Sequence, residues 1–90
     1  MTKGRHEVVL APAAQRQLRR LPPGDAARLR GPILALGLDA RPPGATKLAD
    51  TGFWRLRVGD MRIVYVIDDG KVVVLRVARR AESTYRRVER

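Results

Sequence analysis

Arginines are the residues of this sequence whose types and spacing could do chemistry. Arg55 and Arg57 precede a Gly-Asp pair, and Arg62 follows it. If this pair forms a two-residue hairpin turn, Arg57 directly faces Arg62 on the neighbouring strand. Because side chains alternate between the two faces of a strand, all three guanidinium groups then project to the same side. Guanidinium groups bind phosphate oxygens through paired hydrogen bonds, so the spacing indicates a phosphate-binding patch.

The opposite face of the same hairpin is apolar and suited to packing beneath helices. Its side chains are those of Trp54, Leu56, Val58, Met61, Ile63 and Tyr65. Two arginines at opposed positions repel each other, which is unfavourable for stability alone. We interpret the pair as a site for an anion. The alternative is a solvated outer face on which the arginines extend into water and screening makes the repulsion small.

Arg76 extends the patch if the next turn has the right length. A three-residue loop at 68–70, with its glycine in the left-handed region, places Arg76 on the face of the other arginines. A two-residue loop turns Arg76 to the other face. We predict the three-residue loop because Val73, Leu75 and Val77 then face the helices.

RNA cleavage through the 2′-hydroxyl needs a base, cations that stabilise the phosphate charge, and an acid for the leaving 5′-oxygen. The only histidine is His6, which we interpret as an ordinary strand residue. Arginine is a poor base because its pKa exceeds about 12. Tyr85, with an ordinary pKa of about 10, is a weak base unless arginines lower that pKa. The sequence predicts catalysis by electrostatics and positioning, or binding without cleavage.

No metal site or cofactor is expected. The nine acidic residues are scattered, and Asp68 and Asp69 are interpreted as turn residues rather than metal ligands. The sequence has no glycine-rich phosphate loop that leads into a helix.

The composition points to an anionic partner. Nineteen basic residues against nine acidic ones give a net charge of +10, although 44% of the residues are hydrophobic and can form a core. A GC-rich genome would explain the preference for Arg over Lys but not the excess of positive charge. The 90 residues predict a single domain, 1–90, and lack cysteine, a signal peptide and an apolar run long enough for a membrane span. We therefore expect a soluble, cytoplasmic protein without membrane contact.

The first half of the chain reads as a strand and two helices. Residues 6–10 predict the strand, and Pro12 suits the first turn of a helix whose apolar positions are Ala14, Leu18 and Leu21. The Pro-Pro-Gly run at 22–24 ends this helix.

The second helix is expected to begin with Asp25 as its cap. Its apolar positions are Ala26, Leu29, Ile33 and Leu36, with Leu34 beside them. Pro32 should kink this helix or end its regular part.

The second half predicts strands. The Arg-Pro-Pro-Gly run indicates a loop over 39–50, and the ranges 53–58, 61–67 and 72–77 have the composition of strands. The charged tail, 81–90, is expected to form a short helix or to stay mobile. The predicted fold is α+β with the order β-α-α-β-β-β: a mostly antiparallel four-stranded sheet with a helical hairpin on one face.

The stretch WRLRVGDMRIVYVIDDGKVVVLRVARRAESTYRR resembles the C-terminal half of toxins of the RelE/ParE superfamily. The front half agrees, with "LRRLP" at the end of the first helix and "RPPG" followed by Lys-Leu before the hairpin. The resemblance covers nearly all of the chain. It implies a barnase-like α/β fold, a type II toxin–antitoxin operon, and cleavage of mRNA in the ribosomal A site without a metal. It also implies an acidic antitoxin as partner, in a hetero-oligomer.

The resemblance assigns roles by position. Arg57 and Arg62 would hold the scissile phosphate, Arg80 would stabilise or protonate the leaving oxygen, and Tyr85 would stack on a base or act as the general base. The residues expected to bind RNA are Arg55, Lys47, Arg76 and Arg79. Relatives often carry lysine at positions 55 and 57, so this chain lacks a proton acceptor that they have.

Two other functions remain open. ParE-type members share the fold but poison DNA gyrase by binding, and a basic nucleic-acid-binding module without toxicity has the same charge. The antitoxin is expected to cover the arginine patch or to displace the tail that bears Tyr85.

Overall fold

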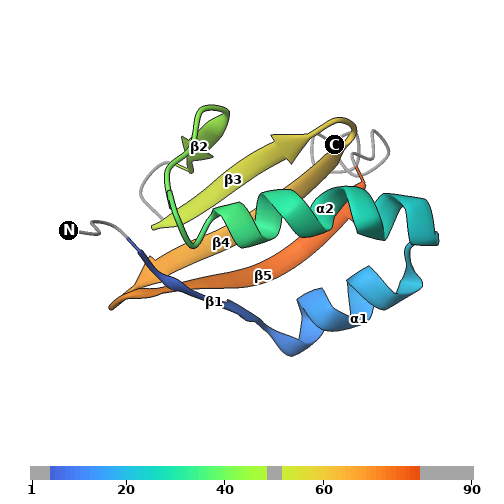
Figure 1. Cartoon of the computed structure of the whole chain (residues 1–90), viewed down its shortest axis with the longest axis horizontal. Coiled ribbons are helices and arrows are strands. Elements are labelled where there is room, and N and C mark those ends of the chain that lie inside the picture. Colours follow the sequence, from blue (N-terminus) through green and yellow to red (C-terminus); the bar gives the residue numbers. More distant parts are fainter. Residues whose placement is uncertain (1–4, 49–51, 80–90) are drawn as a thin grey trace, which may run out of the picture.

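The computed structural model describes residues 5–48 and 52–79. Its elements in chain order are β1 (Glu7–Leu10), α1 (Pro12–Arg20), α2 (Pro23–Ala35), β2 (Ala45–Lys47), β3 (Phe53–Val58), β4 (Met61–Asp68) and β5 (Lys71–Arg79). The strands form one sheet in the order β1-β5-β4-β3-β2, in which β1 runs parallel to β5 and the other pairs are antiparallel. Figure 1 shows α2 lying across the sheet and α1 beside β1 and β5.

The predicted α+β fold with a helical hairpin is confirmed, but the sheet has five strands instead of four. The additional strand, β2, lies within the range 39–50 that was expected to be a loop. It pairs with β3, so that Ala45 lies opposite Leu56 and Thr46 opposite Arg55. A strand of three residues is too short to show an alternating pattern of its own, which is why the sequence did not reveal it.

One apolar core lies between the sheet and the two helices. Its buried members are Ala14, Leu29, Ile33, Leu36, Ala40, Leu56, Met61, Ile63, Tyr65, Val72, Val74 and Val77. The prediction that one face of the β3–β4 hairpin packs beneath the helices is therefore confirmed. Leu34 is 61% exposed and lies outside the core, beside the row of apolar side chains that α2 turns toward the sheet.

The start of α2 differs from the expectation. Pro22 occupies the cap position, and Asp25 lies in the first turn without capping the helix. Its carboxylate instead binds Arg28 and Arg79. The helix continues past Pro32 to Ala35, so this proline does not end it.

The turn between β4 and β5 has two residues, so the predicted three-residue loop was wrong. Asp68 pairs directly with Lys71, and the two turn residues, Asp69 and Gly70, have φ values of 49° and 81°. Positive φ at both positions is typical of a type I′ turn, whose twist suits a hairpin.

Arg76 nevertheless lies on the predicted face. A β-bulge falls at the step from Val64 to Tyr65, which are paired with Arg76 and Val74, so Leu75 is the additional residue. One additional residue reverses the alternation of side chains along β5. The two-residue turn and the bulge together give Arg76 the orientation that a three-residue loop would have given. Before the bulge, Val74 rather than Val73 faces the core.

The end of α2 approaches β1 closely at Gly37. The backbone N–H of His6 donates to the carbonyl oxygen of Gly37 at 2.7 Å. A Cβ at position 37 would lie 2.8 Å from the carbonyl oxygen of His6 and 3.1 Å from a methyl group of Val8. Glycine is therefore needed here for the packing of β1 against the helical layer.

Tyr65 connects the core to the segment that leads into β2. Its side chain is fully buried, and its hydroxyl donates to the carbonyl oxygen of Ala40 at 2.7 Å. Burial raises the pKa of Tyr65 to about 12 because it disfavours the phenolate. This bond holds the chain at Ala40 in the position from which it continues to β2. Among the described residues, no helix is long and apolar enough to cross a membrane.

Replacing Tyr65 with phenylalanine should lower the free energy of unfolding at pH 7 by about 1–3 kcal/mol, because a buried carbonyl group loses its donor. The pH dependence gives a second test. Tyrosine in the unfolded chain loses its proton near pH 10, whereas Tyr65 in the folded protein keeps it up to about pH 12. The free energy of unfolding therefore falls as the pH rises from about 10 to about 12, by roughly 1.4 kcal/mol per pH unit.

Urea unfolding from pH 7 to pH 12 measures both effects. Tyr65→Phe should remove this part of the alkaline loss, and Tyr85→Phe, which changes the other of the two tyrosines, should retain it. An equal alkaline loss in Tyr65→Phe and the wild type would contradict the role given to this hydroxyl.

Candidate nucleic-acid interface

The face of the sheet opposite the helices, here called the outer face, carries arginines in two neighbouring rows. In one row, Arg57 of β3 lies directly opposite Arg62 of β4. In the next row, Arg55 lies opposite Val64, which is in turn opposite Arg76 of β5. The predicted pairing of Arg57 with Arg62 is confirmed, and four guanidinium groups come from three adjacent strands. Rows that are two residues apart along a strand are separated by about 6.6 Å.

The arginines of the outer face differ in exposure. Arg57 and Arg76 are exposed, whereas Arg55 and Arg62 are half-buried. The Nε atom of Arg62 is buried. Partial burial restricts the rotamers of a side chain, so Arg55 and Arg62 are held more firmly than the exposed pair. Less conformational entropy is then lost when they bind a ligand.

A pocket of about 390 Å³ opens beside these arginines. Arg55 and Arg57 line it from β3, and Gly44 and Thr46 line it from the chain that forms β2. Gly44 has a φ of 95°, a conformation that favours glycine and lets the chain turn into β2. The sequence analysis did not include Thr46 in the site, because the strand that positions it was not predicted.

Arg79 lies on the other face of the sheet. It pairs with Met61, whose side chain is in the core, so its own side chain points to the helix side. There its Nη1 atom contacts Asp60 at 2.7 Å, and its Nη2 atom contacts Asp25. Hydrogen bonding to Arg79 holds the pKa of Asp25 below its ordinary value, and the same bond raises the pKa of Arg79. The structure does not bring Arg79 together with Arg57 and Arg62.

Lys47 is also separated from the outer arginines. It pairs with Trp54, whose neighbour on β4 is the buried Tyr65, so its side chain belongs to the helix side of the sheet edge. Arg80 and Tyr85, the other two residues expected in the site, lie outside the described residues. Their roles stay predictions.

His6 lies just before β1 and not within it, although the strand was expected to span 6–10, and it is remote from the arginines of the outer face. It comes directly before Glu7, which pairs with Lys71 beside the β4–β5 turn. Arg62 lies near the other end of β4, so roughly 20 Å of strand separate it from this turn. Within the described parts of the chain, no group of three His, Asp or Glu side chains could hold a metal ion.

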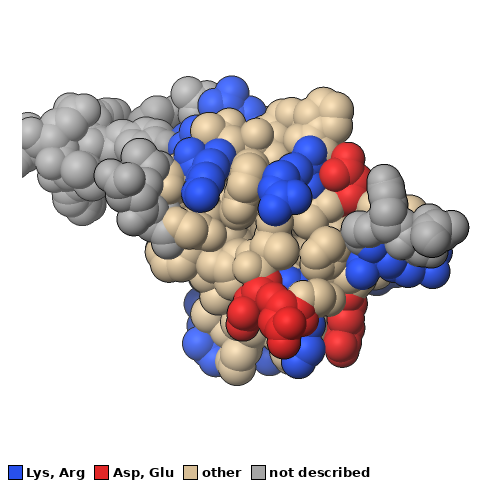
Figure 2. Space-filling view, turned by 90° about the vertical axis from the view of Figure 1, so that its left-hand side faces the viewer, with Lys and Arg blue, Asp and Glu red and all other residues tan. Residues whose placement is uncertain are grey.

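The surface that contains the β4–β5 end of the sheet carries charges of both signs. Figure 2 shows Lys and Arg side chains over its upper part, and in its lower part a group of acidic side chains with further Lys and Arg side chains beside them.

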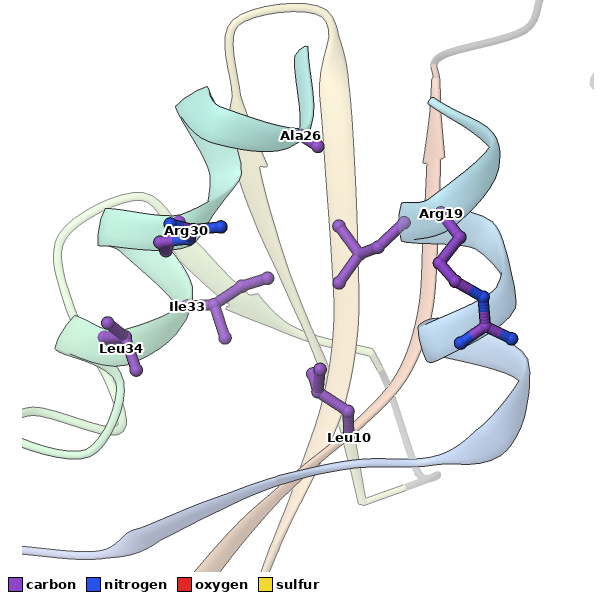
Figure 3. A pocket seen from close by; sticks show the side chains of 7 residues that line it. Leu10, Arg19, Ala26, Arg30, Ile33 and Leu34 are labelled. Carbon is purple, nitrogen blue, oxygen red and sulfur yellow. The ribbon is translucent and has the colours of Figure 1, made fainter. Parts of the chain in front are cut away.

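A second hollow, of about 340 Å³, lies between the helices and is here called the helix groove. It is lined by Leu10, Leu18, Arg19, Ala26, Arg30, Ile33 and Leu34. Figure 3 shows Ile33 and Leu10 in the space between α1 and α2, with Arg30 on the side of α2 and Arg19 on the side of α1. The groove therefore combines an apolar floor with two cations.

The same arrangement of helices and strands occurs in solved structures of toxins. A chain of the archaeal RelE–RelB complex from Pyrococcus horikoshii is 25% identical, with 90% of this chain and 98% of that chain covered and a TM-score of 0.74. A chain of the toxin–antitoxin complex RelBE2 from Mycobacterium tuberculosis is 30% identical, with coverages of 84% and 99% and a TM-score of 0.66. The isolated Escherichia coli RelE toxin is 18% identical, with coverages of 93% and 96% and a TM-score of 0.72.

These likenesses and the cationic sheet define a small basic α+β protein with the fold of RelE-type toxins. The family model of ParE toxins of type II toxin–antitoxin systems, parDE, matches residues 8–84. The chain belongs to this family and is a toxin of a type II toxin–antitoxin system. No curated protein sequence matches it.

Replacing Arg57 with threonine should stabilise the protein. The change removes the repulsion from Arg62 and introduces a residue that favours strands, so we expect the free energy of unfolding to rise by roughly 0.2–1 kcal/mol. Urea unfolding at low salt measures the gain, which should shrink at high salt because screening weakens the repulsion.

Arg76→Thr is the matched control, because Arg76 lies on the same face but opposite Val64 instead of a cation. A gain in Arg57→Thr no larger than in Arg76→Thr would show that the opposed arginines do not repel each other appreciably.

Proposed function

We propose that this toxin is a metal-independent endoribonuclease that cleaves mRNA in the A site of the ribosome and so stops translation. The observation that carries the proposal is the opposition of Arg57 and Arg62 on a solvent-facing sheet, with Arg55 in the adjacent row. Such a pair is unfavourable without an anion and favourable around a phosphate. A toxin that acts on ribosomes works in the cytoplasm.

In the proposed mechanism Arg57 and Arg62 hold the non-bridging oxygens of the scissile phosphate. As the 2′-oxygen attacks, negative charge grows on these oxygens, and the two guanidinium groups stabilise it more in the transition state than in the ground state. Arg80 stabilises or protonates the leaving 5′-oxygen. Tyr85 stacks on a base or, as its phenolate, accepts the proton of the 2′-hydroxyl.

The dependence on the ribosome is proposed because the arginines cannot act as a general base. A guanidinium group does not accept a proton at ordinary pH, and His6 is at the far end of the sheet. The protein therefore supplies charge, and the ribosome supplies orientation of the mRNA. Correct orientation of the attacking hydroxyl can contribute several kcal/mol to the lowering of a barrier.

Poisoning of DNA gyrase is the second candidate function. It is favoured by the match to the family model that carries the ParE name. A gyrase poison acts by binding and does not need charge directed at a scissile phosphate. The two functions differ in their consequence for the cell: fragmented mRNA for the nuclease, and DNA damage with an SOS response for the gyrase poison.

Cleavage is tested with ribosomes programmed with a defined mRNA, with primer extension as the readout. The wild-type protein should produce cuts at A-site codons. Arg57→Ala and Arg62→Ala should each reduce the cleavage rate by about 100-fold or more, the effect expected when one stabilising group of a transition state is removed. Arg80→Ala should reduce the rate as well.

Arg16→Ala is the control, because Arg16 is exposed on α1 and not on the outer face. Its cleavage rate should equal that of the wild type. If the wild-type protein does not cut mRNA and its expression induces an SOS response, the nuclease proposal is wrong and poisoning of gyrase is the function.

The proposed antitoxin partner is an acidic protein that contacts the helix groove through an amphipathic helix. The apolar floor fits the apolar stripe of such a helix, and Arg19 and Arg30 fit its flanking carboxylates. Leu34, which is 61% exposed on α2, would be covered on binding. Docking on the helical layer would add to the expected contact of the antitoxin with the outer face.

Charge reversal tests this docking. The double variant Arg19→Glu with Arg30→Glu should bind the antitoxin of the same operon at least about 10-fold more weakly, because each carboxylate then faces a like charge. The control, Arg5→Glu with Arg16→Glu, makes the same change in net charge away from the groove. Equal affinities of the two double variants would exclude the helix groove as a docking site.

A further inference from the structure

The outer face has an apolar row next to its arginine rows. Phe53 of β3 lies opposite Val66, which lies opposite Val73, and Val73 also pairs with Val9 of β1. The three valines are half-buried, whereas Phe53 is 40% exposed. The helices cover the other face of the sheet, so this row is not part of the core between them.

Phe53 is unusual among the apolar residues of the described chain. The other large hydrophobic side chains that are similarly exposed are Leu34 and Leu38, which lie at the end of α2 and just beyond it. Phe53 is the aromatic member of this group, and it lies on the sheet face that carries the arginines. An aromatic side chain presents a flat surface that can stack on a base.

The spacing along β3 matches the repeat of a nucleic acid. Phe53, Arg55 and Arg57 alternate on the outer face, and successive members of this set are about 6.6 Å apart. This distance is close to the length of one nucleotide in an extended single strand. One strand of protein therefore presents an aromatic ring and then two cations at the intervals at which RNA presents a base and then two phosphates.

We propose that Phe53 is a stacking site for a base of single-stranded RNA, two steps along the RNA from the phosphate that is held by Arg57 and Arg62. The inference rests on the proposed ribonuclease function and adds a base subsite to its phosphate site. Stacking tolerates any base, because every base has a π face. Val66 and Val73 extend the apolar surface on which the stacked base lies.

The contributions of the stacking contact and the phosphate contacts to RNA affinity can be distinguished by their dependence on salt concentration. Binding through phosphates releases counterions, so the logarithm of the affinity for single strands falls with the logarithm of the salt concentration by about 0.7 per phosphate contacted. Stacking releases no counterions. Removal of the ring should therefore change the affinity without changing the slope, whereas removal of an arginine should change both.

The experiment uses the full chain and a fluorescent hexanucleotide of 2′-O-methyl RNA, which cannot be cleaved through its 2′-oxygen. Phe53→Ala should weaken binding about 10-fold at an unchanged salt slope, in line with the usual effect of removing one stacked aromatic side chain. Phe53→Tyr should bind as the wild type does. Phe53→Leu, which keeps an apolar side chain at the strand, should be weakened as alanine is.

Leu34→Ala is the matched control, because it removes an exposed apolar side chain from the helical layer. It should leave RNA binding unchanged. A second set of probes has one abasic nucleotide each, at a different position in each probe. At one position the loss of the base should weaken binding to the wild type but not to Phe53→Ala, because this variant has already lost the ring on which the base stacks.

The outcomes separate the stacking site from the ribonuclease proposal. Unchanged affinity in Phe53→Leu, together with a lower affinity and a smaller salt slope in Arg57→Ala, overturns the stacking site and leaves the phosphate site intact. A wild-type protein that does not bind the hexanucleotide also overturns the stacking site, whereas the ribonuclease proposal is overturned only by the absence of cleavage on programmed ribosomes.

Discussion

The opposition of Arg57 and Arg62 on neighbouring strands is the constraint on which the proposed function of this small protein depends. Opposed like charges on neighbouring strands cost roughly 0.2–1 kcal/mol, whereas burial of one large aliphatic side chain stabilises a fold by about 1.5–3 kcal/mol. The opposite face of the same hairpin buries Leu56, Met61 and Ile63 beneath the helices. The core can therefore hold two cations in positions that they would not adopt by themselves.

The arginines on the two faces of the sheet have different neighbours. On the helix side, Arg79 is neutralised by Asp25 and Asp60, and this contact ties the end of β5 to the start of α2 and to the β3–β4 turn. On the outer side, Arg57 is paired across the sheet with another cation. The carboxylates that fix the fold are thus on one face, and the charge proposed to meet RNA is on the other.

Most of the fold, and the opposition of two arginines in the candidate site, could be predicted because they follow from local rules. The two-residue turn before Met61 fixes the register that opposes Arg57 and Arg62. The position of Arg76 was predicted correctly for a wrong reason, because a β-bulge leaves no mark in the pattern of a Val-rich strand. β2 was missed because it has three residues, and Arg79 was misplaced because its carboxylate partners come from distant segments.

The most direct measurement is a crystal structure of the protein with a short 2′-O-methyl RNA bound. The account predicts one phosphate within hydrogen-bonding distance of the guanidinium groups of both Arg57 and Arg62, on the sheet face away from the helices. RNA bound on the helical layer, or held by only one of these two arginines, would contradict it.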